Sequence, residues 1–99
     1  MTTEQRLDAV VRGRVQGVGF RFHAVRAAER LGLVGWVANE ADGAVHCVAE
    51  GSPDDLHRLL AELRTGPAGA WVDRVDESWS PATGEFVRFS VRSGWHGGD

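Results

Sequence analysis

Residues 7–32 read LDAVVRGRVQGVGFRFHAVRAAERLG, and this stretch decides the fold. Its first part, Leu7 to Val15, is rich in β-branched residues and predicts a strand, and the glycine-containing segment from Gln16 to Gly19 predicts a loop. From about Arg21 to Leu31 apolar residues recur at near-helical spacing, namely Phe22, Val25, Ala28 and Leu31. Gly32 stands where a helix takes its left-handed cap. We therefore expect a strand, a loop and a helix in direct succession.

A hairpin is predicted after this helix. Leu33 to Asn39 again has a strand-like pattern, and Ala44 to Glu50 is the expected partner strand. Between them, Asp42-Gly43 supplies the positive backbone dihedrals of a tight hairpin turn.

A second helix is predicted from its start and stop signals. Ser52 is the expected N-cap, Pro53 takes the first helical position, and Asp55 approximates a capping box. One apolar stripe follows, made of Leu56, Leu59, Leu60 and Leu63. Gly66-Pro67 ends the helix.

Two further strands complete the pattern. Trp71, Val75 and Trp79 alternate with charged residues, as in a half-exposed strand. A last strand is expected from Phe86 to Arg92, with Val87, Phe89 and Val91 on one face. The segment from Ser93 to Asp99 is expected to fray, and Trp95 within it has no explanation in the pattern.

The element order is strand, helix, strand, strand, helix, strand, with one extra strand. It predicts an α+β, ferredoxin-like βαββαβ sandwich in which two helices cover one face of an antiparallel sheet. We expect a single domain over residues 1–99, with a core from about 7 to 92. The fold alone does not indicate a function.

Composition narrows the class of partner. The chain has 99 residues and a net charge of −3, which disfavours nucleic acid and anionic membrane as partners. It has no apolar run of membrane-spanning length, and its start, MTTEQRLD, lacks the features of a signal peptide. Its single cysteine fits a reducing compartment. We expect a cytoplasmic monomer.

The segment from Gly13 to Arg21 is the candidate binding site. A glycine-containing loop that enters a helix turns backbone amides toward one point, and the helix dipole favours an anion there. Five arginines against one acid between Arg12 and Arg30 add positive charge. A positive side chain at a helix start is unfavourable to the dipole, so Arg21 is better explained by a ligand than by the helix.

Two other phosphate-handling loops are disfavoured. No Lys-Ser or Lys-Thr follows the glycines, as a nucleotide-binding P-loop with magnesium requires. The position six residues before Arg21 is Val15, so a cysteine phosphatase would lack its nucleophile.

The motif GRVQGVGFR, followed by LGLVGWVANEADGAV, closely resembles the acylphosphatase family. The resemblance covers roughly Val10 to Val91. It implies hydrolysis of small acyl phosphates without metal or cofactor. It also implies that the loop amides and Arg21 hold the phosphate, and that Asn39 orients the attacking water. The phosphate-binding positions carried over are Gln16, Gly17, Val18, Gly19, Phe20 and Arg21, and the catalytic ones are Arg21 and Asn39.

Two positions depart from the family pattern. Ala38 stands where many relatives have arginine, and Glu40, directly after Asn39, would weaken phosphate affinity if it points inward. Among other candidates, Cys47 is expected to be a buried hydrophobe. His23, His46, His57 and His96 lack metal-ligand spacing.

Two alternatives remain open. One is a binding module of the same fold, either an oxyanion sensor or an RNA-binding sheet. The other is a role like that of related domains at the front of larger carbamoyl-transferring proteins, although a free-standing enzyme is the simpler expectation. The motif specifies the phosphate end of the substrate and leaves the physiological acyl group open.

Overall fold

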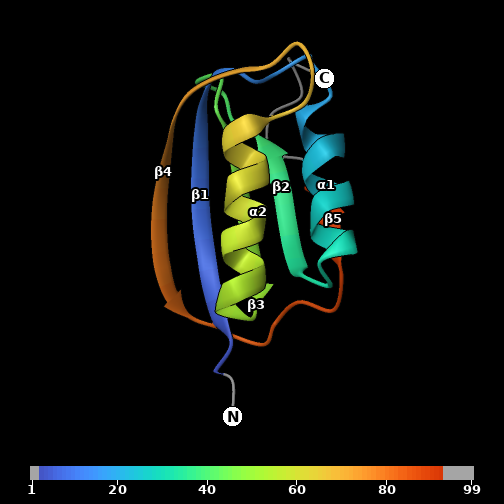
Figure 1. Ribbon diagram of the computed structural model, residues 1–99, viewed down its shortest axis with the longest axis vertical. Coiled ribbons are helices and arrows are strands. Elements are labelled where there is room, and N and C mark those ends of the chain that lie inside the picture. Colours follow the sequence, from blue (N-terminus) through green and yellow to red (C-terminus); the bar gives the residue numbers. More distant parts are fainter. Residues whose placement is uncertain (1–2, 93–99) are drawn as a thin grey trace.

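The computed structural model describes residues 3–92, and the expectations for residues 93–99, Trp95 included, fall outside this range. Two helices cover one face of a five-stranded sheet whose strand order is β4-β1-β3-β2-β5 (Figure 1). The elements are, in chain order, β1 (Gln5–Arg14), α1 (Phe20–Arg30), β2 (Val34–Asn39), β3 (Val45–Gly51), α2 (Pro53–Thr65), β4 (Trp71–Pro81) and β5 (Phe89–Val91). The ferredoxin-like sandwich is confirmed.

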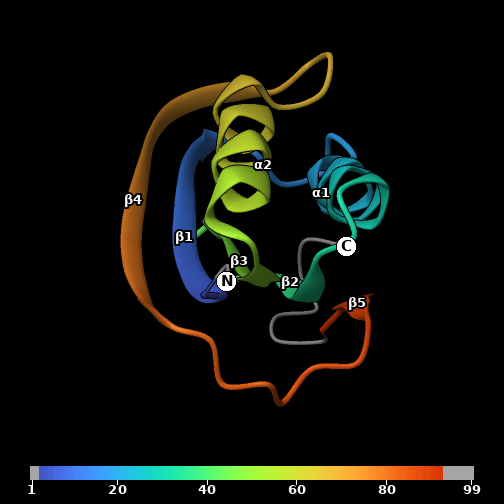
Figure 2. The ribbon, with the colours of Figure 1, turned by 60° about the horizontal axis from the view of Figure 1, so that its bottom comes forward.

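The sheet is mixed because of its last strand. The pairings of β1 with β3, β1 with β4 and β2 with β3 are antiparallel, as predicted. The extra strand β5 instead pairs parallel to β2, with Val91 opposite Val37. β4 and β5 lie at opposite edges, so the segment that joins them crosses from one edge to the other (Figure 2).

Strand alternation and helix periodicity build one core between the sheet and the helices. Inward residues of β1 and β3 are fully buried, and the predicted leucine stripe of α2 packs on them; the core residues of these elements are Leu7, Ala9, Val11, Val45, Cys47, Ala49, Leu56, Leu59, Leu60 and Leu63. In Figures 1 and 2 both helices lie on this same face. The core therefore fixes where α1 begins relative to the strand ends.

The capping residues predicted for the start of α2 and the end of α1 are confirmed. The Ser52 side chain accepts from the amide of Asp55, and Pro53 occupies the first turn of α2. At the end of α1, Gly32 has φ 69° and its amide donates to the carbonyl of Glu29, while the Leu33 amide donates to the carbonyl of Ala28. This pair of bonds is the Schellman arrangement.

The predicted apolar face of α1 was wrong at Phe22, which is 66% exposed. The buried residues of α1 are Phe20, Ala24, Ala27 and Ala28. Phe22 lies about 200° around the helix from Phe20, since each residue turns the helix by about 100°. The three buried alanines are small, so the helix can lie close to the sheet.

Two details of the strands also differ from the prediction. Trp71 is exposed and Val72 packs on the core instead, because a bulge opposite Arg12 and Gly13 shifts the alternation of β4. The last strand is shorter than expected and begins at Phe89, so Val87 lies outside it and is 89% exposed.

The turn between β2 and β3 was correctly placed but differs in conformation. Gly43 has a positive φ of 95°, whereas Asp42 does not. The amide of Gly43 donates to the carbonyl of Glu40, and the Asp42 carboxylate accepts from the amide of Ala44. A type I turn with glycine at its fourth position explains this geometry.

Candidate active site

The loop between β1 and α1 has the backbone geometry of an anion site. Gly17 and Gly19 have φ values of 74° and 80°, which residues other than glycine rarely adopt. Apart from each glycine and its two chain neighbours, no described residue has an atom within 4 Å of the position that a Cβ would take at either glycine. The backbone here is therefore open to a ligand.

The start of α1 is not neutralised by its own side chains. Gly19 is the N-cap and makes no side-chain capping bond, and the first turn of α1, which is fully described, contains no acidic residue. The amides at a helix start have no acceptors within the helix, and the dipole adds partial positive charge there. A bound anion would accept hydrogen bonds from these amides and would be stabilised by the positive end of the dipole.

Gln16 ties this loop to the neighbouring hairpin. Its side-chain nitrogen donates to the carbonyl oxygens of Glu40, at 2.8 Å, and Ala44, at 3.0 Å. These two carbonyls flank the turn that follows Asn39. The Gln16 side chain therefore holds the loop in register with the end of β2.

Asn39 is the last residue of β2 and is only 2% exposed. Its neighbour on β3 is Val45, whose side chain is part of the core. Within residues 3–92, no buried side-chain nitrogen or oxygen lacks a hydrogen-bond partner. The Asn39 carboxamide is therefore fixed by its buried surroundings. A group that orients a small molecule needs such a fixed position.

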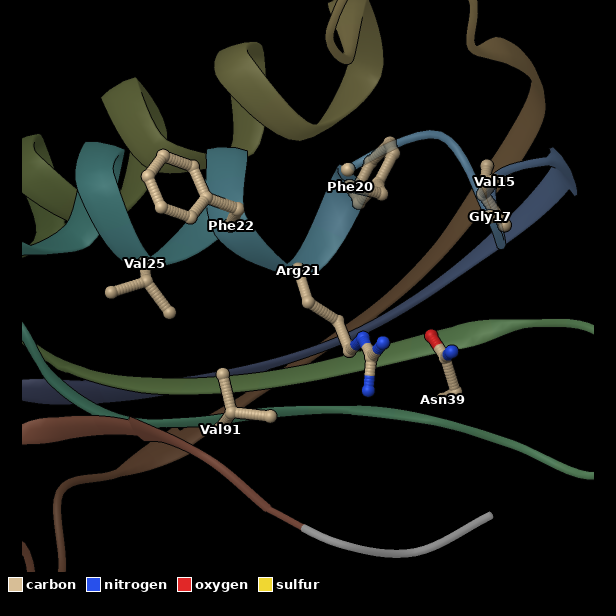
Figure 3. A pocket seen from close by; sticks show the side chains of 9 residues that line it. Val15, Gly17, Phe20, Arg21, Phe22, Val25, Asn39 and Val91 are labelled. Atoms are coloured by element: carbon tan, nitrogen blue, oxygen red, sulfur yellow. The ribbon is translucent and has the colours of Figure 1, made fainter. Parts of the chain in front are cut away.

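Arg21 reaches from α1 to the same place. In Figure 3 its side chain extends from the helix toward the sheet, and its guanidinium and the Asn39 carboxamide face each other. Both residues line a cavity of about 520 Å³, within the usual range for small-molecule sites. The described residues around this cavity are Val15, Gly17, Gly19, Phe20, Arg21, Phe22, Val25, Asn39 and Val91.

The structure brings most of the predicted site residues together. Gly17, Gly19, Phe20, Arg21 and Asn39 line the cavity. Two do not: the Gln16 side chain bonds to the hairpin, and Val18 packs against the core. Their predicted part in phosphate binding concerns backbone amides and stays a prediction.

Four lining residues were missed as site residues, namely Val15, Phe22, Val25 and Val91. Phe22 and Val25 follow Arg21 on α1, and Val25 is four positions on, which places it on the same helix face. Helical spacing could have identified it. Val91 comes from β5, and only its pairing with Val37 on β2 brings it near Asn39.

Glu40 does not line this cavity. Its carboxylate lies 3.2 Å from Nδ1 of His46, whose Nε2 lies 2.8 Å from the Asp8 carboxylate. His46 alternates with the core residues Val45 and Cys47, so this cluster occupies the sheet face opposite the helices. Burial would raise the pKa of Asp8, but the hydrogen bonds from His46 and Arg6 hold it below its ordinary value.

Burial or structural contacts account for the other candidate reactive residues that the structure describes, which are a cysteine and histidines. Cys47 is completely buried, as predicted, and burial raises the pKa of its thiol to about 12. His23 lies near the carbonyl of Glu62, and His57 near that of Pro53. Residues 3–92 contain no group of three or more His, Cys, Asp or Glu side chains suited to a metal ion. His96 lies outside this range.

Comparison with known proteins relates this geometry to a family. A family model described as Acylphosphatase matches residues 7–91. An acylphosphatase of Salinibacter ruber is 49% identical over 90 residues, which cover 91% of this chain and 95% of the relative.

Solved structures agree with the sequence match. A crystal structure of acylphosphatase from Bacillus subtilis has a TM-score of 0.86 at 33% identity, covering 89% of this chain and 98% of its own. An acylphosphatase structure from Coxiella burnetii has a TM-score of 0.84 at 37% identity, covering 91% and 94% respectively. No helix in the part of the chain described here is long and apolar enough to cross a membrane.

Proposed function

The chain belongs to the acylphosphatase family, and on that premise we propose that it hydrolyses small acyl phosphates to a carboxylate and inorganic phosphate, with Arg21 and Asn39 as catalytic residues. One observation carries the proposal. Three segments that are separate in sequence, the 16–19 loop, the start of α1 and the end of β2, meet at one cavity. They supply open backbone, a guanidinium and a carboxamide to the same small volume (Figure 3).

Phosphate binding is assigned to the loop and Arg21. The amides from Gln16 to Phe20 and the guanidinium surround a tetrahedral anion, with the glycines allowing close approach. In phosphoryl transfer the transition state spreads negative charge over the equatorial oxygens. Preorganised donors stabilise that charge without reorganising during the reaction.

Asn39 is assigned to the water. Its carboxamide can accept a hydrogen bond from water through oxygen and donate one through nitrogen, and its burial keeps it in place. The aimed water attacks phosphorus, and the bond from phosphorus to the bridging oxygen breaks. The electron pair leaves with the carboxylate, and the proton of the attacking water passes to a phosphate oxygen or to solvent.

The proposed reaction proceeds without metal or cofactor. A carboxylate is a weak base and departs without a strong general acid. The guanidinium and the backbone amides of the loop supply the positive potential that phosphoryl transfer requires. We also propose a cytoplasmic monomer that does not bind nucleic acid, which the net charge of −3 and the single buried cysteine support.

Hydrolysis of benzoyl phosphate by the purified chain in excess chelator tests this function. Turnover is expected, and inorganic phosphate should inhibit it competitively. If calorimetry detects phosphate binding while no acyl phosphate is hydrolysed, the chain is an oxyanion-binding module. Turnover that the chelator abolishes would contradict the metal-free mechanism.

A further inference from the structure

The cavity has two chemically different ends. Gly17, Gly19, Arg21 and Asn39 supply the polar groups of the end that the proposed phosphate site uses, where the buried Val15 and Phe20 also line the cavity (Figure 3). The other end, between α1 and β5, is lined by Phe22, Val25 and Val91. In Figure 3 Val25 points from the helix toward the sheet and Val91 from β5 toward the helix, with Arg21 between them and Asn39.

Two of these apolar side chains are unusually exposed. Phe22 is 66% exposed and Val91 is 52% exposed. Within residues 3–92, the other exposed large hydrophobic residues are Trp71 and Val87. Single exposed apolar side chains are normal, but a group at one cavity marks a contact surface. The guanidinium of Arg26 lies 5.6 Å from the Phe22 ring centroid and supports the ring in this position.

We propose that Phe22, Val25 and Val91 form an acyl-group subsite, and that the preferred substrates are acyl phosphates with an apolar acyl chain. The inference rests on the proposed function. In an acyl phosphate a single bridging oxygen separates phosphorus from the acyl carbon, so the acyl group must lie within the same cavity as the phosphate. The apolar end is the part of the cavity that the phosphate contacts leave available.

The charges around the cavity support an apolar rather than an anionic acyl group. Among the described residues that line it, Arg21 is the only charged one, and its guanidinium would be paired with the phosphate. A second hollow beyond Phe22 contains His23, Arg26 and Arg30. Two of these basic groups already face Glu62, Arg30 at 3.2 Å and His23 at 3.5 Å. A second anionic group on the substrate would compete with that carboxylate.

A homologous series of substrates tests the subsite. Acetyl, butanoyl and hexanoyl phosphate release carboxylates of nearly equal basicity, so differences in kcat/KM report binding of the chain. We expect kcat/KM to rise by roughly two- to fourfold per added methylene until the cavity is filled. This fold-change corresponds to the free energy of burying one methylene group. 3-Phosphoglyceroyl phosphate, which carries a second anion, should be a poorer substrate than hexanoyl phosphate.

Matched variants locate the effect. Val91→Ala and Phe22→Ala should each lower the hexanoyl-to-acetyl ratio of kcat/KM by roughly threefold, because each removes apolar contact. Val87→Ala is the control, since Val87 is 89% exposed and does not line the cavity. Its ratio should equal that of the wild type. Equal melting temperatures of the three variants show that the change is local.

The outcomes separate the subsite from the proposed function. Turnover of acetyl phosphate with no dependence on chain length, or a preference for 3-phosphoglyceroyl phosphate, overturns the subsite alone. Absence of turnover with every acyl phosphate overturns both. A flat series together with concentration-dependent dimerisation that Val91→Asp prevents would assign the apolar surface to a second copy and overturn the subsite.

Discussion

The side-chain nitrogen of Gln16 lies 2.8 Å from the carbonyl oxygen of Glu40, the residue directly after Asn39. A second bond from the same nitrogen reaches Ala44. The 16–19 loop is thus fastened to the hairpin whose first strand ends in Asn39. The distance between the proposed phosphate cradle and the proposed water-orienting carboxamide depends on this link.

Gln16→Ala should therefore lower kcat by roughly tenfold, since small misplacements of reacting groups cost up to about a hundredfold. The effect should appear mainly in kcat, because the amides and Arg21 remain to bind phosphate. Steady-state kinetics of benzoyl phosphate measure it. Gln5→Ala, at the far end of β1, is the matched control and should leave kcat unchanged. An equal loss in both variants would indicate a general destabilisation.

Arg21→Gln should lower kcat/KM by roughly a hundredfold or more, because a preorganised charge is lost where negative charge develops. Arg30→Gln removes the same charge from the last turn of the same helix and should have little effect. Measuring both variants with benzoyl phosphate separates local from general electrostatics. Near-normal turnover in Arg21→Gln would remove Arg21 from the mechanism.

Asn39→Ala should lower kcat by roughly a hundredfold while inorganic phosphate still binds with near wild-type affinity, because the water and not the phosphate loses its partner. Calorimetric titration with phosphate gives the affinity and also shows that the variant is folded. Asn39→Asp is a second test: its charge would face the substrate anion, so phosphate affinity should fall. Weakened phosphate binding in the alanine variant would place Asn39 in the anion site instead.

Glu50 makes folding dependent on pH. Its carboxylate is 2% exposed and accepts from the amides of Thr83 and Gly84 and from the Thr83 hydroxyl. Burial would raise the pKa of Glu50, but these hydrogen bonds hold it below its ordinary value of 4.5. A lowered folded-state pKa stabilises the protein above about pH 4.5, and this contribution is lost as the pH falls through the folded-state value.

Glu50→Gln should therefore cost about 1–3 kcal/mol of unfolding free energy at pH 7, the scale of unpaired buried donors. The difference from wild type should shrink at pH values below 4.5. Urea denaturation across pH 3 to 7 measures both, with Glu85→Gln, exposed in the same segment, as control. A difference that stays constant across this range would contradict the role of the carboxylate charge.

Local chemistry predicted much of this fold. The Ser52 cap, the leucine stripe of α2 and the Gly32 cap were correct because they depend on residues a few positions apart. The face of α1 was misjudged at Phe22, since near-helical spacing alone fits more than one face. The exposure of Trp71 was also missed, because the bulge in β4 forms where this strand pairs with Arg12 and Gly13 of β1, which is distant in sequence.

The sequence by itself determined the glycine loop, the arginine at the helix start and the family, since each lies in short contiguous motifs. Tertiary structure alone decided that Gln16 bonds to the hairpin, that Glu40 turns to the opposite sheet face, and that Val91 joins the cavity. The physical reason is that these three facts depend on strand pairing across long sequence separations. Periodicity shows which face of a strand is apolar but not which strand becomes its neighbour.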